Sequence, residues 1–542
     1  MTKMHGHYVA AAAVVVVAVV LLLPGCLDAA FPDPDEVVIV DAGALEEGSS
    51  CYFPVTAPVV PESPEARREH YRAIAAKDLA RHQRMAASSR RRQLAASDMP
   101  DLLAATSGSG TALSTFELPM QSALDSMDVG MYLVTVHFGT PAVAYSMALD
   151  TANDLTWLNC RLRGHRRHRD RDRTNANAKT MSLEQALEPP LVKKTWYRPA
   201  RSSSWRRYRC SMRDSCARFP HVACKTPNHN ESCSYHQHLQ DGTETRGIFG
   251  RETATVAVSG GRQARLPGLV LGCSTFESGG TVDAHDGVLT LGNDKVSFGR
   301  IAGKSFQGLF SFCLLATHSG RDAFSYLTFG PNPAMEAGGG AGFGETDIVY
   351  VQNAPSLGVQ VTAVFVNGQR LNIPPEVWNY RINGGLNLDT GTSVTSLLEP
   401  AYSVVTRALA TLLDPKLDKA AEEVIPFEHC YKWDGKNPAP EAIVPKLELV
   451  LMGGARLEPS PKGVLMPEVV PGVACIGFFR REVGPNILGN VHMQEHIWEF
   501  DDVKGKLRFK KDKCTTHINI PPPNANPKPN PNPNPNPNPT NN

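Results

Sequence analysis

The chain of 542 residues lacks a net charge of any size, because 55 basic side chains are set against 54 acidic ones. Without an overall field to attract nucleic acid or an anionic membrane surface, neither is expected as a partner. The zinc spacing Cys-x-x-Cys is also missing, since Cys210, Cys216, Cys224 and Cys233 are separated by six, eight and nine residues. We therefore expect no metal and no organic cofactor.

Long apolar runs are scarce too. One run of sixteen apolar or small residues, at positions 8–23, follows a lysine and precedes Pro-Gly-Cys. That arrangement is typical of a secretory signal, and the run is slightly short for a membrane span. We predict a signal peptide at residues 1–26 and no stable membrane span, with an uncleaved signal anchor as the alternative.

A secretory route makes the twelve cysteines candidates for disulfides rather than free thiols. Cys26 lies near the expected cleavage point, and Cys51 precedes the part expected to fold. The ten cysteines from Cys160 to Cys514 are even in number. Complete pairing among these ten is therefore expected.

The composition changes along the chain. Residues 27–118 are rich in alanine and arginine, carry a helical apolar pattern and end in a Ser/Gly stretch. We predict a basic helical segment followed by a cleavable linker, although a solvated tail without a role fits the composition equally well. Residues 516–542 are expected to be an extended low-complexity tail, because from residue 521 onward they are dominated by proline and asparagine and cannot form a core.

The region between these segments has short runs of Val, Phe, Tyr and Thr separated by Gly, Pro and Asn, which is typical of antiparallel β structure. Asn367-Gly368 predicts a tight hairpin turn. One helix is clearly indicated within residues 399–415, where it ends at a proline. Residues 161–173 hold seven arginines and two histidines. Without a nucleic-acid-binding fold around them, a solvated loop is the favoured interpretation.

Two Asp-Thr sequences follow apolar segments in the two halves of this β region. Asp150 follows AYSMAL and begins DTAN, whereas Asp389 follows GGLNL and begins DTGT. Each is followed later by an apolar pair near a glycine, in residues 286–292 and in residues 485–490. The chain therefore repeats one pattern with divergence, and its length suits two lobes.

The repeated pattern resembles that of the pepsin-like aspartic peptidases, in particular the plant nepenthesin-like branch, over roughly residues 131–514. The resemblance is carried by YLVTVHFGTP, LDTANDLTWLNC, FSFCL, LNLDTGTSVTSL and ILGNVHMQEHIWEFD. It implies a mainly β, bilobal fold with the active cleft between two related β lobes, at residues 119–335 and 336–515. It also makes residues 27–118 an inhibitory prosegment whose basic side chains could neutralise the active site.

The resemblance implies that Asp150 and Asp389 are catalytic. Two carboxylates within hydrogen-bond reach cannot both ionise cheaply, so they share a proton. The ionised group takes a proton from water, which attacks the peptide carbonyl, while the protonated group donates toward the carbonyl oxygen. The implied protein is an aspartic endopeptidase active at acidic pH, a monomer acting on polypeptides in the extracellular space (apoplast) or the vacuole.

The second loop is complete by the standard of the family. Thr390, like Thr151 of the first loop, matches a threonine whose hydroxyl bonds across to the other lobe. Gly391 leaves room beside the carboxylate of Asp389, and Thr392 can donate to its outer oxygen. These four residues are therefore expected to support the catalytic pair.

The first loop departs from the family. Ala152 replaces a glycine, and we expect its methyl group to crowd the pair and to make a glycine-like backbone costly. Asn153 replaces a serine or threonine, but its amide can still donate a hydrogen bond. Thr290 stands where the second half has Gly489, and we expect its branched side chain to press on the same spot.

The resemblance places the flap at residues 239–242, where Leu239 replaces the family tyrosine and is followed by Gln, Asp241 and Gly242. The flap can still close on a substrate, but without that hydroxyl group. Two interpretations therefore stay open: an active peptidase with reduced rate or narrow specificity, and a secreted pseudopeptidase that binds peptides or proteins, similar in fold to plant xylanase-inhibitor proteins. Retention of both aspartates favours the peptidase.

The resemblance also implies two disulfides. Cys313 would pair with Cys514 and Cys430 with Cys475, whereas the pairing of the other six cysteines cannot be deduced from the sequence. Trp157 is expected to pack in the core beside the first loop rather than to face a substrate.

Overall fold

The computed structural model describes residues 39–41, 78, 116–122, 130–162, 194–210, 216, 222–224, 231–238, 243–258, 262–278, 285–316, 325–336, 342–350, 355–421, 424–434 and 437–514. The predicted signal peptide, the tail, Cys26, Cys51 and the flap positions Leu239, Asp241 and Gly242 lie outside these residues, as does most of the prosegment and of the basic insert. The described chain is mainly β and has the bilobal pepsin-like fold, as predicted.

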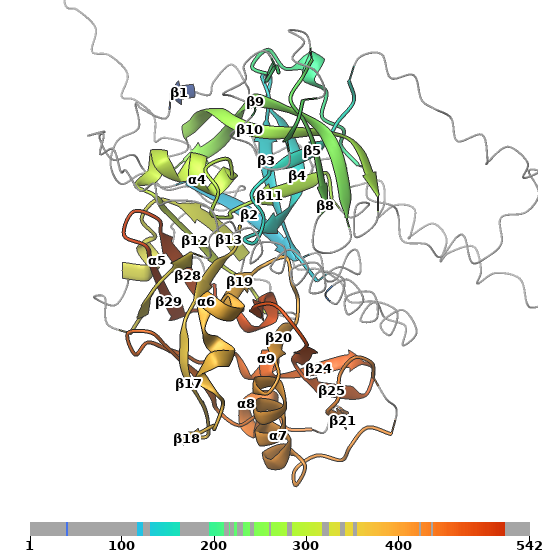
Figure 1. Cartoon of the computed structure of the whole chain (residues 1–542), viewed down its shortest axis with the longest axis vertical. Coiled ribbons are helices and arrows are strands. Elements are labelled where there is room, and N and C mark those ends of the chain that lie inside the picture. Colours follow the sequence, from blue (N-terminus) through green and yellow to red (C-terminus); the bar gives the residue numbers. More distant parts are fainter. Residues whose placement is uncertain are drawn as a thin grey trace, which may run out of the picture. The chain divides into compact units, whose positions relative to one another are not determined.

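The largest sheet contains sixteen strands and draws them from both halves of the sequence (Figure 1). Its strands from the first half are β1 (Ile39–Asp41), β2 (Phe116–Ser122), β3 (Tyr132–Phe138), β4 (Val143–Asp150), β5 (Trp157–Asn159), β6 (Arg206–Arg207), β7 (Val222–Ala223), β8 (Ser234–His238), β9 (Glu244–Val258), β10 (Arg262–Ser278), β11 (Gly287–Thr290), β12 (Leu309–Cys313) and β13 (Ser325–Phe329). Its strands from the second half are β14 (Gly344–Asp347), β28 (His496–Asp501) and β29 (Lys506–Lys511).

The two halves meet within this sheet where β12 pairs with β28 in antiparallel register. Phe310 of β12 lies opposite Phe500 of β28, and their rings stack with centroids 4.7 Å apart. Both side chains are buried, so the junction is part of the hydrophobic core rather than a surface contact.

Three smaller sheets belong to the second half (Figure 1). The six-stranded sheet contains β15 (Val349–Tyr350), β16 (Leu357–Val359), β19 (Leu386–Asp389), β20 (Thr395–Leu398), β26 (Phe478–Arg481) and β27 (Asn486–Gly489). The four-stranded sheet contains β17 (Val361–Val366), β18 (Gln369–Arg370), β22 (Leu447–Leu451) and β23 (Arg456–Leu457). The three-stranded sheet contains β21 (Cys430–Lys432), β24 (Leu465–Val470) and β25 (Val473–Ile476). The predicted hairpin joins β17 to β18, with φ of 46° at Asn367 and 77° at Gly368.

The predicted long helix is α7 (Ala401–Leu413), whose buried face includes Tyr402, Val405, Leu409 and Leu413 at helical spacing. The short helices are α4 (Phe298–Gly303), α5 (Pro333–Glu336), α6 (Tyr380–Asn383), α8 (Pro440–Ile443) and α9 (Pro461–Val464). Single 3-10 turns are η3 (Pro199–Arg201), η5 (Lys304–Phe306), η6 (Pro375–Trp378) and η7 (Asn490–His492). Among the described residues, none of the helices has the length and apolar character needed to cross a bilayer.

All ten cysteines from Cys160 onward are paired. The bonds are Cys160–Cys273, Cys210–Cys224, Cys216–Cys233, Cys313–Cys514 and Cys430–Cys475. The last two are the pairs that the resemblance implied. Because disulfide sulfurs are not thiolate ligands, the close grouping of three cysteines between β6 and β8 is structural.

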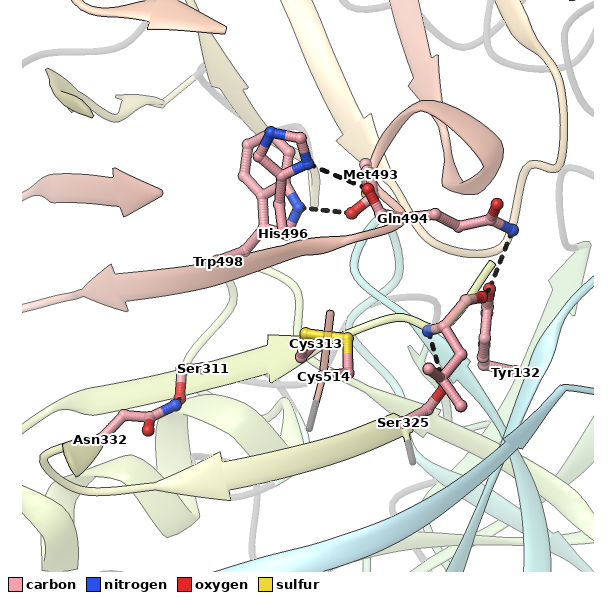
Figure 2. The surroundings of a disulfide bond; sticks show 11 residues. Tyr132, Ser311, Cys313, Ser325, Asn332, Met493, Gln494, His496, Trp498 and Cys514 are labelled. Atoms are coloured by element: carbon pink, nitrogen blue, oxygen red, sulfur yellow. Dashed lines mark hydrogen bonds between the residues drawn. A yellow bond between two sulfur atoms is a disulfide. The ribbon is translucent and has the colours of Figure 1, made fainter. Parts of the chain in front are cut away.

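Figure 2 shows how one disulfide lies within the junction of the two halves. Cys313 ends β12, and Cys514 follows β29. Nearby, the Tyr132 hydroxyl of β3 accepts a hydrogen bond from Gln494 Nε2 at 3.0 Å and donates one to the Leu315 carbonyl at 2.6 Å. Side-chain hydrogen bonds and a covalent link thus hold the same junction that the Phe310–Phe500 stack fills.

Candidate active site

The two aspartates occupy equivalent places at the ends of strands. Asp150 is the last residue of β4, where the parallel strand β11 brings Thr290 opposite it. Asp389 is the last residue of β19, where the parallel strand β27 brings Gly489 opposite it. Both carboxylates are buried, with Asp150 5% exposed and Asp389 fully enclosed. The sequence repeat is therefore a repeat of structure.

The hydrogen bonds to the two carboxylates follow one pattern. Asp389 accepts from the Gly391 amide at 2.9 Å on one oxygen and from the Thr392 hydroxyl at 2.6 Å on the other. Asp150 accepts from the Ala152 amide at 2.8 Å on one oxygen and from the Asn153 side-chain amide on the other. Asn153 thus makes the hydrogen bond expected of it, in the place of a hydroxyl donor.

The threonines next to the aspartates join the two loops. Thr151 Oγ1 donates to the Leu388 carbonyl at 2.9 Å and accepts from the Thr390 amide at 3.0 Å. Thr390 Oγ1 donates to the Leu149 carbonyl at 3.1 Å and accepts from the Thr151 amide at 3.2 Å. These four hydrogen bonds are buried and nearly symmetric, so the structure brings the loops of Asp150 and Asp389 into direct contact.

Ala152 does not carry the backbone cost that was expected of it. Neither Ala152 nor Gly391 is among the described residues with positive φ, so neither takes a backbone angle that favours glycine. The Ala152 side chain is fully buried and packs against Ile487 of β27. The cost expected for a glycine-like backbone does not arise here, because Ala152 has no positive φ and supplies its main-chain amide to Asp150.

Thr290 is accommodated by its own partners. We expected it to press on the carboxylate pair, but its hydroxyl lies 2.9 Å from both the Asp154 carbonyl and the Thr156 hydroxyl. In the second half, a Cβ added at Gly489 would lie 2.5 Å from the Ser393 carbonyl oxygen, which is too close. Glycine is therefore required opposite Asp389 but not opposite Asp150.

A second pair of equivalent threonines supports these strand ends. The Thr290 amide donates to Thr156 Oγ1 at 3.1 Å, and the Gly489 amide donates to Thr395 Oγ1 at 3.0 Å. Trp157, next in the chain, is fully buried and packs with Met131. Trp157 is thus a core residue beside the first loop, as predicted.

Asp78 contacts the loop after Asp389, and the sequence analysis did not predict this contact. It is fully buried, and its carboxylate accepts hydrogen bonds from the amides of Ser393, at 3.2 Å, and Val394, at 3.0 Å. These amides follow Asp389 by four and five residues. Asp78 belongs to the predicted segment 27–118, where the arginines were the signal noticed and this one acid among several had no distinguishing pattern.

Arg481, at the end of β26, was also missed. It is 3% exposed, and burial lowers the pKa of its guanidinium to about 9, while the negative charge of Asp389 acts in the opposite direction. The second half of the site thus holds a buried cation within electrostatic range of its carboxylate. The available signal was an arginine pair following an apolar run, IGFFRR.

Among the described residues, the groups close enough to hold a metal do not include either aspartate. One is the disulfide-bonded cysteine group, and the other is His236, His238 and Glu244 on β8 and β9. The arrangement at the two loops is two buried carboxylates, each of which accepts from one main-chain amide and one side-chain donor.

Known proteins share this architecture. The family described as "Xylanase inhibitor N-terminal" matches residues 132–331, and "Xylanase inhibitor C-terminal" matches residues 358–511. "Aspartyl protease family protein 2" of Arabidopsis thaliana is 27% identical over 407 residues, which cover 72% of each chain. "Aspartic proteinase nepenthesin-2" of Nepenthes gracilis is 24% identical over 390 residues, which cover 71% of this chain and 78% of that one.

Two solved structures show the same fold. The structure titled "Crystal structure of edgp" has a TM-score of 0.56 at 16% identity, covering 74% of this chain and 95% of its own. Basic 7S globulin from soybean has a TM-score of 0.54 at 17% identity, covering 74% and 97%. With paired Asp loops, disulfides and these matches in both halves, the chain belongs to the plant family of pepsin-like aspartic peptidases.

Proposed function

We propose that the protein is an aspartic endopeptidase that hydrolyses peptide bonds at acidic pH through Asp150 and Asp389. The observation that supports this most strongly is the matched set of donors: each buried carboxylate receives one main-chain amide and one side-chain donor. A loop that had lost its function would have no need to retain that pattern around a buried acid, which is costly to bury.

The proposed reaction uses the two carboxylates as one acid-base unit. With one proton shared between them, the ionised group takes a proton from water, and the resulting hydroxide attacks the carbonyl carbon of the peptide. The protonated group donates to the carbonyl oxygen. The tetrahedral species then collapses, the C–N bond breaks, and the leaving nitrogen receives a proton from the pair. The donors from Ala152, Asn153, Gly391 and Thr392 hold both carboxylates in position.

Maturation from an inactive form is part of the proposal. Residues 1–26 would be the signal peptide, residues 27–118 the prosegment, and residues 119–335 and 336–515 the two lobes of a monomer directed to the extracellular space or the vacuole. Five disulfides support a secretory route. The contact of Asp78 with the loop after Asp389 supports a prosegment that covers the site.

This role of Asp78 can be tested by replacing it with alanine. Charge-assisted hydrogen bonds to two amides are lost, so the prosegment should be released faster and at a less acidic pH. Electrophoresis of the full-length protein after an acid pulse measures the rate of self-processing. Processing as slow as in the wild type would show that Asp78 does not restrain the prosegment.

A second candidate function is a pseudopeptidase that binds peptides or proteins without cleaving them. Two observations favour it: the matching families carry the description of xylanase inhibitors, and the first loop reads DTAN with Thr290 opposite the aspartate. The fold would then serve as a recognition surface. The retained donors around Asp150 make this the weaker of the two proposals.

The deciding experiment incubates the secreted, acid-treated protein with a mixed peptide library from about pH 3 to about pH 7, beside an Asp389→Asn control. The proposal expects cleavage in the acid range that is lost in the control. A folded and processed sample that cleaves nothing would favour the pseudopeptidase.

A further inference from the structure

Two histidines and a glutamate gather on the outward face of one strand pair. His236 and His238 alternate along β8 with the buried Tyr235 and Gln237, so both imidazoles lie on the exposed face. In the antiparallel register, His238 lies opposite Glu244 of β9. Directly opposed residues of antiparallel strands point to the same side, so the three side chains share one patch.

The separations within this patch suit a single ion. His236 Nε2 lies 2.7 Å from Glu244 Oε1, and the two imidazole centroids are 4.5 Å apart. One ligand atom from each of the three residues lies within 4.8 Å of the others. A tetrahedral ion with bonds of about 2.0 to 2.2 Å holds its ligand atoms about 3.3 Å apart. Small rotations of three side chains on a paired strand scaffold would therefore complete the geometry.

The donor set selects the class of ion. Two imidazole nitrogens and one carboxylate oxygen suit zinc, copper or nickel, whereas calcium and magnesium prefer oxygen donors. His236 and Arg246 both bond to Oε1 of Glu244. The other carboxylate oxygen of Glu244, Oε2, is thus the one suited to a metal.

We propose that His236, His238 and Glu244 form a binding site for a divalent transition-metal ion of the zinc class, with water completing the coordination. The site is built from β8 and β9 and does not involve the two catalytic aspartates, so the inference stands whether or not the protein hydrolyses peptides. An ion bound there would cross-link the two strands and stabilise the folded state by its binding free energy.

Arg246 gives the proposal an internal control. Its guanidinium lies over the Phe276 ring, 4.6 Å from the centroid. Its Nε donates a hydrogen bond to Glu244 Oε1 at 2.5 Å. A cation in this place competes with a metal for the carboxylate. Replacing Arg246 with glutamine should therefore tighten metal binding several-fold, whereas association with histidines elsewhere on the surface would not respond to this change.

The test is a calorimetric titration of the full-length, tag-free, disulfide-intact protein with zinc chloride at neutral pH, repeated with cobalt to record ligand-field absorption. We expect one specific equivalent, weakened at least about tenfold in His236→Ala and in His238→Ala, because losing a direct ligand costs no less than losing a supporting group. The control His429→Ala, a half-buried histidine outside the patch, should bind as the wild type does.

Both histidines are exposed, so the variants are expected to fold, and circular dichroism checks this. Unchanged zinc affinity in a His236→Ala/His238→Ala double variant would overturn the proposal by placing the ion elsewhere in the chain. So would the absence of a specific equivalent in the wild type. Tighter binding in Arg246→Gln together with loss in the histidine variants would establish the site.

Discussion

The first and second Asp loops differ in residue identity far more than in structure. The first loop reads DTAN and the second DTGT, yet both aspartates end buried strands and accept hydrogen bonds from the same two places. A main-chain amide serves equally well from alanine or glycine, and an asparagine amide replaces a threonine hydroxyl. The arrangement of donors, rather than the motif, is what the two lobes share.

The comparison of the two loops also shows where a larger side chain cannot be accommodated. A side chain at Gly489 would collide with the Ser393 carbonyl. Thr290, at the equivalent strand end, has room for its side chain and two hydrogen-bond partners for its hydroxyl. The first half has therefore changed around its aspartate in ways that the second half could not accept without moving its backbone.

The largest expected effect on activity is that of removing either carboxylate. Asp150→Asn and Asp389→Asn should each lower kcat/KM for an acid-cleaved peptide by about 10³-fold or more, because each removes one half of a shared acid-base unit. Steady-state kinetics on matured protein measure both. A loss confined to Asp389→Asn would show that the first loop only supports the structure.

The cross-lobe threonines should be equal in their contributions to stability. Thr151→Val and Thr390→Val each remove a hydroxyl that donates to a carbonyl and accepts from an amide of the opposite loop. Leaving these buried groups unpaired should cost about 2 to 4 kcal/mol in the free energy of unfolding. Urea denaturation gives the values, and a difference of more than about 1.5 kcal/mol between the variants would contradict the symmetry.

In the second half, the buried His492 ends η7, three residues after Gly489. It is fully buried against Phe478 with ring centroids 4.6 Å apart, its ring nitrogens have no hydrogen-bond partner among the residues that the structure describes, and burial lowers its pKa to about 3. Because the unfolded chain takes up this proton first, stability should fall as the pH drops from about 6.5 toward 3.

His492→Leu should remove this acid sensitivity. The gain in the free energy of unfolding should be larger at pH 4 than at pH 7, by at most about 3 kcal/mol. Urea midpoints at the two pH values measure the difference. A gain that is the same at both would show that His492 does not resist protonation in the fold.

The smallest expected effect is that of Ala152→Gly. It removes the methyl contact with Ile487 and adds backbone freedom, while the amide that bonds to Asp150 stays. We expect a loss of about 0.5 to 1 kcal/mol in stability. Thermal unfolding measures it, and a stabilised variant would mean that the methyl group strains the loop.

Some features predicted correctly from the sequence depend on local pattern, whereas the Cys313–Cys514 bond and the threonine contacts between the lobes were implied by the family resemblance. The Asn367-Gly368 turn, the helix α7 and the two Asp-ending strands each follow from residues close together in the chain. The features that were missed depend on distant partners. Asp78 bonds to amides more than 300 residues away, and the space around Thr290 is made by Asp154 and Thr156. No spacing rule contains that information, because it arises only when the strands pair.

The most direct test of the central claim restores the family motif in the first loop. The claim is that DTAN holds Asp150 as DTGT holds Asp389, so the double variant Ala152→Gly/Asn153→Thr should have a kcat/KM within about tenfold of the wild type. A folded, matured wild type that cleaves nothing, beside a double variant that hydrolyses the same peptide about 10³-fold faster, would contradict it.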